Sequence, residues 1–422
     1  MFSYIISGKS AVTKMVYYEM KKIFSKTSGR IAVICLIGLL IVVCGFAVSG
    51  VSYMNEQGEK ENGVAAVRKL REAKKEWSGP LTEEKIGEVI AANLTVNNTE
   101  EYRSRDIRKS DIAFGWKQGF SDIRMLLVYA YGAFRDYDYY RPDSLVPEDA
   151  EAFYANRTAH LKEWLDTEAK DQFLEEEKAF LVEKYQEMET PLYYDYADGW
   201  KQLFEFAPTL LMIMVLILGF LAANLFSCEY QYKADSVFFT SCHGRGRAVS
   251  AKIKAGFLLI TGIYWLSVLL YVGIVLGILG ADGANCVIQT GRGGWKSFYN
   301  ITYWQEGLLV FAGGYAGCLF ILFLTMLISA ASRSAVVAVM TPFILIFVPS
   351  FLGGIRFPLI NKILGLMPDQ LLQMNMVVSY FNLYSIAGRI MGAAGIILVV
   401  YSVMTVMICP LLYRIYRKAQ VK

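Results

Sequence analysis

The sequence is poor in the residues from which buried catalytic and metal sites are usually built. It has two histidines, His160 and His243, and none of its seven cysteines lies within residues 54–205. That stretch therefore has no disulfide framework. The two histidines leave no credible Ser-His-Asp triad, and Cys228, Cys242 and His243 match no zinc spacing and lack a fourth ligand. An enzyme is the weakest function class for this chain.

A nucleotide site is missing from the pattern as well. Gly8-Lys9-Ser10 resembles the end of a phosphate-binding loop, but the glycine required five positions before Gly8 is replaced by Ser3, and no strand precedes it. The long apolar runs hold almost no ionisable residue away from their ends. A charge at mid-bilayer costs about 2.5 to 3.5 kcal/mol, so proton and sodium relays usually show buried carboxylates or histidines. We therefore expect any uphill transport to draw its energy from elsewhere.

Apolar residues are abundant. They make up 55% of the chain, and the mean hydropathy is +0.36, both typical of a membrane protein. We predict an all-α polytopic membrane protein, because six apolar runs are long enough to cross about 30 Å of hydrocarbon. A signal peptide is the alternative for the first run, but the run and its leader are too long for one. The predicted spans are residues 31–53, 206–226, 255–280, 307–330, 334–351 and 390–413.

Residues 54–205 form a large insertion between the first two spans. Val64, Val67 and Leu70 recur at helical spacing, and Thr82 is a plausible N-cap before Glu83. The pattern predicts a helical domain. Its cluster of aromatic residues either closes a core or faces a ligand, and packing in the core or at the bilayer interface is the favoured interpretation. These aromatic residues are Tyr131, Phe134, Tyr137, Tyr139 and Tyr140.

Charge is distributed unevenly along the chain. Residues 54–205 carry 21 Lys and Arg against 32 Asp and Glu, whereas the rest carries 21 against 6. Cytoplasmic loops collect basic residues. With both termini inside, the short inner segments hold 16 basic residues and the short outer loops five. We therefore predict cytoplasmic termini and an extracytoplasmic 54–205 domain, and this explains the charge better than nucleic-acid binding does.

Two further segments flank the spans. Residues 10–28 read as an amphipathic helix in the membrane interface, and the alternative is a basic flank that orients the first span. We place this helix within a cytoplasmic N-terminus, residues 1–30, and expect a cytoplasmic tail at 414–422. Residues 357–389 are semi-polar and contain two prolines. We predict a re-entrant segment there on the outer side.

The connector between the second and third spans, residues 227–254, is short and basic. It carries Lys233, Arg245, Arg247, Lys252 and Lys254 against only Glu229 and Asp235. Because two spans hold its ends, a charged loop of this kind is suited to docking a cytoplasmic partner. Its run is Glu229-Tyr230, Phe238-Phe239-Thr240, Gly244-Arg245-Gly246-Arg247 and Ala251-Lys252.

This connector and the six-span layout resemble the membrane subunits of ABC type-2 exporters. Members have a connecting helix before the first span, a coupling helix between the second and third, and re-entrant helices before the sixth. The long first outer loop is similar to Gram-positive permeases that include antimicrobial-peptide exporters. The resemblance implies a bacterial cytoplasmic membrane and a dimer with a second copy or paralogue. It also implies a separate ATPase subunit that binds ATP and magnesium, so this chain would need no cofactor of its own.

The resemblance assigns contact with that ATPase to five connector residues, of which Glu229 and Arg245 would be the main contacts. The alternative is that the basic residues anchor the loop to anionic membrane lipid. An amphipathic peptide or lipid-like substrate would suit a path lined by Phe, Met, Tyr and small residues. The competing function is a membrane sensor or assembly scaffold whose outer domain binds a ligand. The five connector residues are Glu229, Asp235, Arg245, Arg247 and Lys252.

Overall fold

The computed structural model describes residues 2–241, 244–291, 293–353 and 358–418, with the side chains of residues 2–11 and 358 excepted. Six helices in it are long and apolar enough to span a membrane, so the chain is a mostly helical multi-pass membrane protein. Each overlaps one predicted span. They are α2 (Thr27–Ser49), α10 (Asp198–Gln231), α12 (Arg247–Leu279), α13 (Tyr303–Ser332), α14 (Ala335–Leu352) and α17 (Ala393–Arg417).

Helices α10 and α12 are longer than a bilayer requires. They have 34 and 33 residues, which correspond to about 50 Å at helical rise. The hydrocarbon core is about 30 Å thick, so both helices extend beyond it. The chain therefore remains helical in charged sequence at Asp198 and Lys201, ahead of the apolar run that begins at residue 206.

Helices α10 and α13 form the centre of the bundle. In each, 61% of the most apolar window is buried, compared with 22 to 33% in the other four. Close packing depends on small residues: a Cβ at Gly219 of α10 would meet Pro342 of α14 at 2.7 Å. Helices α13 and α14 form a tight hairpin, in which Arg333 takes a left-handed conformation with φ 58° and Ser334 caps α14.

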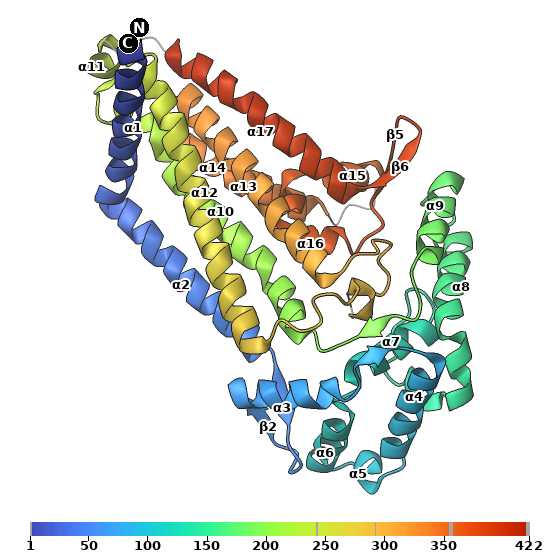
Figure 1. The fold of residues 1–422 in the computed structure, drawn as a ribbon. Coiled ribbons are helices and arrows are strands. Elements are labelled where there is room, and N and C mark those ends of the chain that lie inside the picture. Colours follow the sequence, from blue (N-terminus) through green and yellow to red (C-terminus); the bar gives the residue numbers. More distant parts are fainter. Residues whose placement is uncertain (1, 242–243, 292, 354–357, 419–422) are drawn as a thin grey trace.

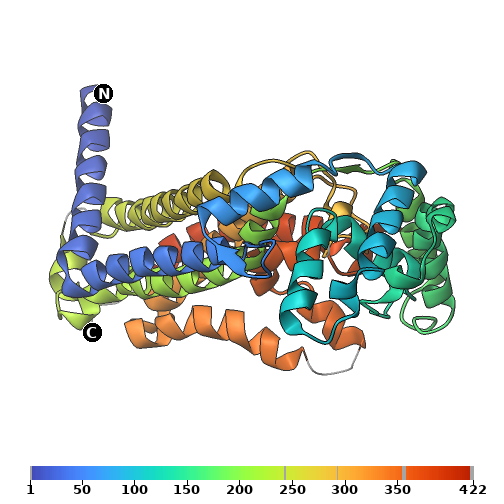
Figure 2. The same ribbon diagram turned by 90° about the horizontal axis from the view of Figure 1, so that it is seen from below.

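One end of the bundle, here called the connector end, carries the N-terminal helix α1 (Phe2–Ser25), the short helix α11 (Asp235–Thr240) and both chain termini (Figure 1). Helix α1 leaves the bundle at an angle to α2 (Figure 2). The angle arises at Lys26, whose backbone is extended, and a Cβ at Gly29 would collide with the carbonyl oxygen of Ile23. The apolar side chains Met20, Ile23 and Phe24 pack against the bundle core.

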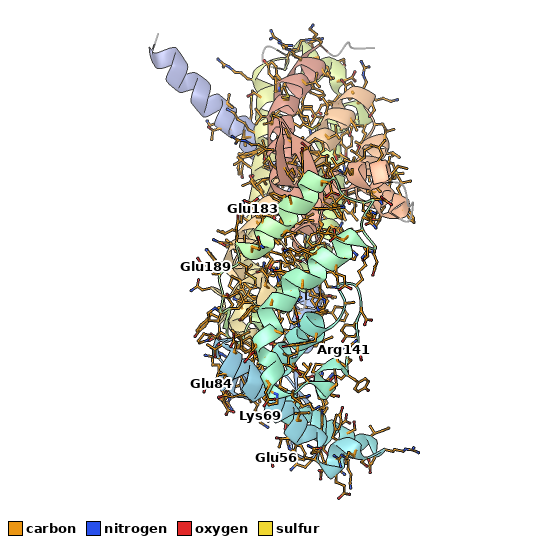
Figure 3. All side chains as sticks on the ribbon, turned by 90° about the vertical axis from the view of Figure 1, so that its right-hand side faces the viewer. Glu56, Lys69, Glu84, Arg141, Glu183 and Glu189 are labelled. Carbon is orange, nitrogen blue, oxygen red and sulfur yellow. The ribbon has the colours of Figure 1, made fainter. Side chains whose placement is uncertain are left out.

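The opposite end, the domain end, carries the insertion domain, residues 52–197 (Figure 1). It is helical as predicted, and Thr82 caps its helix by accepting a hydrogen bond from the Lys85 backbone. Charged side chains spread over its surface, from Glu56 to Glu183 (Figure 3). Its helices are α3 (Val64–Lys75), α4 (Glu83–Asn97), α5 (Glu100–Arg103), α6 (Ile107–Lys117), α7 (Ser121–Tyr131), η1 (Arg141–Ser144), η2 (Pro147–Ala152), α8 (Phe153–Asp166) and α9 (Glu175–Gln186).

The description "all-α" needs a small correction, because the described residues include three two-stranded antiparallel sheets. Strands of two to four residues are too short to show a period in the sequence. The sheets pair β1 (Ser52–Met54) with β2 (Lys60–Asn62), β3 (Gly79–Pro80) with β4 (Tyr193–Tyr194), and β5 (Leu383–Ile386) with β6 (Arg389–Gly392).

The loops between spans complete the core of the insertion domain. Trp295, from residues 280–302, packs in one domain core with Phe153, and Phe298 and Leu383 pack in another with Leu161. The insertion domain is thus packed onto the loops and does not hang from its two linkers alone. The remaining elements are η3 (Ile288–Thr290), α15 (Pro358–Leu364), η4 (Pro368–Gln373) and α16 (Met374–Val377).

The segment predicted as re-entrant enters the bundle where it is described, at residues 358–389. Helix η4 packs against α13 and α17. A Cβ at Gly317 of α13 would meet the Leu371 side chain at 2.8 Å, and the Tyr401 hydroxyl of α17 donates a hydrogen bond of 2.7 Å to the Leu366 carbonyl. Residues 366–377 therefore form part of the bundle packing.

Candidate functional site

Glu229 is the centre of a buried charge cluster at the connector end. It lies in the last turn of α10, with only 5% of its surface exposed. Its Oε1 accepts hydrogen bonds from Lys22 of α1 at 2.7 Å and from Lys252 of α12 at 2.8 Å. Its Oε2 accepts one from the Tyr416 hydroxyl of α17 at 3.1 Å and one from the Cys228 thiol at 3.1 Å. One carboxylate thus joins four helices.

Lys252 completes this cluster. It is fully buried, and its ammonium group donates to Glu19 of α1 at 3.0 Å and to the Leu225 carbonyl at 3.0 Å, as well as to Glu229. The charges of two lysines and two glutamates therefore cancel within the cluster. Burial by itself lowers the pKa of Lys22, but the adjacent carboxylate of Glu229 raises it above its ordinary value. The connector-end cluster, as we call it, consists of Glu19, Lys22, Glu229, Lys252 and Tyr416.

Helix α11 is attached to this cluster by aromatic contacts. The rings of Phe238 and Phe239 lie 6.1 and 5.3 Å from the Tyr416 ring. Arg245 lies on the Phe239 ring at 5.2 Å and donates from Nε to the Phe239 carbonyl at 3.2 Å. The opposite side of the helix is open, and Val237 is 73% exposed. One side of α11 is therefore fixed to the bundle, and the other is an accessible apolar surface.

The structure separates the five predicted connector residues into two groups. Glu229 and Lys252 are brought together and buried, with their charges paired inside the chain. Asp235 is half-buried at the start of α11, Arg247 is half-buried at the start of α12, and Arg245 is exposed. The cluster also includes Glu19, Lys22 and Tyr416, and no sequence pattern indicates their pairing with the connector.

A second charge cluster lies at the domain end, where α10 emerges. Lys74 of α3 pairs with Asp198 at 2.7 Å and with Asp122 of α7 at 2.9 Å, and Lys201 pairs with Asp122 at 2.8 Å. The Tyr194 hydroxyl donates to Asp122 at 3.0 Å. Burial alone would raise the pKa of Asp122, but Lys201 and Lys74 hold it well below its usual range. The insertion domain is thus ion-paired to the central helix.

Two further carboxylates of the chain are buried. Asp369 of η4 is 2% exposed, and its Oδ1 has no hydrogen-bond partner among the described residues. Its Oδ2 accepts from Gln370 at 2.9 Å. Glu306, in the first turn of α13, is 7% exposed.

Metal and nucleotide sites find no support within the described ranges. These ranges contain no group of three or more His, Cys, Asp and Glu residues that could hold a metal ion. Cys242 and His243 lie outside the described residues. Gly8-Lys9-Ser10 lies inside α1, whose helix begins at Phe2. The chain matches no protein-family model, no curated protein and no solved structure.

Proposed function

We propose that the chain is the membrane-spanning subunit of an ABC type-2 exporter in a bacterial cytoplasmic membrane. In this proposal it carries an amphipathic peptide or lipid-like substrate across the membrane as a dimer with a second copy or a paralogue. A separate ATPase subunit binds ATP and magnesium and docks at the connector end, which faces the cytoplasm. The insertion domain then lies on the extracytoplasmic side.

The observation that carries the proposal is the attachment of α11. A short helix between two spans transmits force only if it is rigidly joined to those spans and still presents a free surface. Phe238 and Phe239 provide the attachment through Tyr416, and the exposed Val237 provides the surface. The residues expected to contact the ATPase then become those around α11, including Asp235 and Arg245. Glu229 and Lys252 instead position the connector.

The test is ATP hydrolysis by the complete complex. The chain is reconstituted in vesicles with the ATPase encoded beside it, and hydrolysis is compared between Val237→Glu and Val64→Glu. Val64 is the matched control because it is 65% exposed, compared with 73% for Val237, and lies in the insertion domain. We expect Val237→Glu to abolish stimulation by the permease and Val64→Glu to preserve it, because a buried carboxylate without a partner destabilises an apolar contact. Equal stimulation in the two variants would reject α11 as the docking surface.

Orientation is tested separately by thiol labelling. Single cysteines replace Ser236 of α11 and Ala155 of α8 in a chain without other reactive thiols; both positions are exposed. On intact cells an impermeant reagent should label Ala155→Cys and leave Ser236→Cys unlabelled until the membrane is opened. The reverse result would place the insertion domain in the cytoplasm and eliminate the exporter proposal.

A ligand sensor is the second candidate function. A cavity of about 240 Å³ lies beside the domain-end cluster and is lined by Lys117, Arg124 and Lys201 among others. Burial lowers the pKa of Lys117 to about 8, although Asp143 opposes the shift. A sensor predicts that a kinase gene, and not an ATPase gene, neighbours this one. It also predicts that the purified chain stimulates no ATPase.

A further inference from the structure

The cavity of about 240 Å³ beside the domain-end cluster lies between α6, α7 and the first turn of α10. A single buried water needs about 10 to 15 Å³ of such space, so the cavity has room for a ligand of many atoms. Phe114 and Tyr139 line it and remain 49% and 36% exposed, so the cavity opens to solvent beside aromatic rings. We call it the Lys117 cavity. Its polar lining residues are Lys117, Ser121, Asp122, Arg124 and Lys201.

The charges around this cavity leave one cation in excess. The two lysines and the two aspartates of the domain-end cluster cancel one another, and Arg124 pairs with Asp143 at 3.0 Å. Lys117 forms no ion pair with a carboxylate among the described residues, although only 5% of its surface is exposed. A lysine is rarely buried to this degree unless it is paired. The Lys117 cavity therefore carries one uncompensated positive charge.

The neutral contacts of Lys117 do not replace a counter-charge. Its ammonium donates a hydrogen bond to Oδ1 of Asn97 and lies 4.1 Å from the centre of the Tyr102 ring. An ammonium has three donor hydrogens, so these two contacts leave capacity for a further acceptor. Burial lowers the pKa of Lys117 to about 8, because the attraction of Asp143 does not make up for the loss of water. An anion beside Lys117 would supply the missing charge.

We infer that the Lys117 cavity binds an organic carboxylate with an apolar or aromatic body, and that the carboxylate lies beside Lys117. A single negative charge balances the one uncompensated cation, whereas a phosphate dianion would leave a new unpaired charge. Phe114, Met125 and Tyr139 provide walls for the body of the ligand. The ligand is either a free aromatic acid or the C-terminal residue of a peptide that enters past these rings.

The cavity also adjoins the central helix of the bundle. Lys117 belongs to α6 and Arg124 to α7, both in the insertion domain, whereas Lys201 belongs to α10. A ligand in the cavity therefore lies between the insertion domain and α10. This inference deepens the second candidate function, because it names a ligand class for a sensor. Binding itself is measured without an ATPase or a kinase, so it can succeed or fail independently of either candidate function.

The test is isothermal titration of the purified full-length chain in detergent micelles with sodium indole-3-acetate and with indole-3-acetamide, its neutral counterpart. A second pair of ligands is N-acetyl-alanyl-tryptophan with a free or an amidated C-terminus. We expect the acids to bind and the amides not to bind. Tighter binding of the free peptide than of indole-3-acetate identifies a peptide terminus as the source, and the reverse order identifies a small acid. If neither acid binds, or if each amide binds as well as its acid, the inference is overturned.

Lys117→Met is the first variant, because methionine preserves the apolar stem and removes the charge. Losing one charge-assisted hydrogen bond should weaken indole-3-acetate binding at least about tenfold. Lys162→Met is the matched control, since it makes the same change at an exposed position of α8 outside this cavity. Lys117→Arg keeps the positive charge and should restore most of the binding, which separates loss of charge from loss of fold. Equal binding by Lys117→Met and Lys162→Met would refute the inference.

Ser121→Phe tests the cavity itself without changing any charge. Ser121 lines the cavity at the start of α7, so a phenylalanine side chain there occupies the space that the ligand needs. We expect this variant to lose indole-3-acetate binding while its circular dichroism spectrum stays that of the unchanged chain. Undiminished binding by Ser121→Phe would place the ligand elsewhere and overturn the inference.

Discussion

The connector-end cluster makes a quantitative prediction about stability. Glu229→Gln preserves the shape of the side chain and removes its charge. Lys252 is then left fully buried with Glu19 as its remaining carboxylate. Breaking a buried ion pair on one side costs about 3 to 5 kcal/mol, because the abandoned charge has no water around it. Lys22 adds little to the loss, since its side chain is 37% exposed and can be hydrated. We expect Glu229→Gln to lower the free energy of unfolding by about 3 kcal/mol.

The double variant distinguishes pairing from simple loss of packing. Lys252→Met alone removes one cationic partner of Glu229 and leaves the other, Lys22, at 2.7 Å. We therefore expect Lys252→Met to lower the free energy of unfolding by about 2 kcal/mol. Glu229→Gln combined with Lys252→Met leaves no fully buried charge. The double variant should therefore be more stable than the sum of the two single costs predicts, by about 2 kcal/mol, which lies within the range found for side chains in contact.

The assay is reversible unfolding in mixed detergent micelles, followed by far-UV circular dichroism, which gives the free energy of unfolding of each variant. Glu61→Gln is the control, because Glu61 pairs with Lys69 at 2.7 Å on the exposed surface, with side chains 31% and 47% exposed. Such an exposed pair is hydrated and screened, so its removal should change the free energy of unfolding little. The coupling would be refuted if the double variant lost as much free energy of unfolding as the two single variants together. It would also be refuted if Glu229→Gln lost no more than Glu61→Gln.

Two further predictions concern the bend between α1 and α2 and the stability of the chain in acid. Gly29→Ala forces a Cβ against the Ile23 carbonyl and should lower the free energy of unfolding by about 1 to 3 kcal/mol in the same assay. Gly38→Ala is the control, because a Cβ at Gly38 meets open space and should not lower the stability. Equal losses of stability in the two variants would contradict the steric argument. Burial alone would raise the pKa of Asp143, but hydrogen bonds from Asn93 and Tyr102 lower it to about 2. This depressed pKa stabilises the fold above the unfolded value of about 3.9, and the stabilisation is lost as the pH falls toward about 2. Tryptophan fluorescence across an acid titration should show that loss, and Asp143→Asn should flatten the profile; an unchanged profile would contradict the assignment.

The sequence predicted the six spans because a bilayer imposes a minimum apolar length that is easy to read. It predicted the cap at Thr82 because an N-cap depends on local chemistry. It did not predict where α10 begins. Asp198 and Lys201 precede the apolar run, yet α10 already includes them, because Lys74 and Asp122 neutralise their charges. That neutralisation comes from residues distant in the sequence, so no local pattern reveals it.

At the candidate site, too, the sequence indicated the residues but not the long-range contacts between them. The sequence marked Glu229 and Lys252 as charged connector residues, and charged residues between spans are normally hydrated. The structure buries both, because α1 and α17 cover them. Lys22 lies 207 residues from Glu229, and Tyr416 lies 187 residues from it. Pairings over such distances follow from how α1 and α17 pack against α10, and the amino-acid composition does not indicate them.

Helix α10 carries an acidic residue of each cluster: Asp198 at the domain end and Glu229 at the connector end. An ion pair of 2.7 to 2.8 Å, as at Lys74 and Lys252, tolerates little displacement. Since α10 is one continuous helix of 34 residues, an axial shift that changes the pairing of Glu229 must also move Asp198. Any movement of α12 past α10 at the connector end must break the Lys252 pair or carry α10 with it. If α10 is carried along, the displacement reaches α3 and α7 of the insertion domain, about 50 Å away at helical rise.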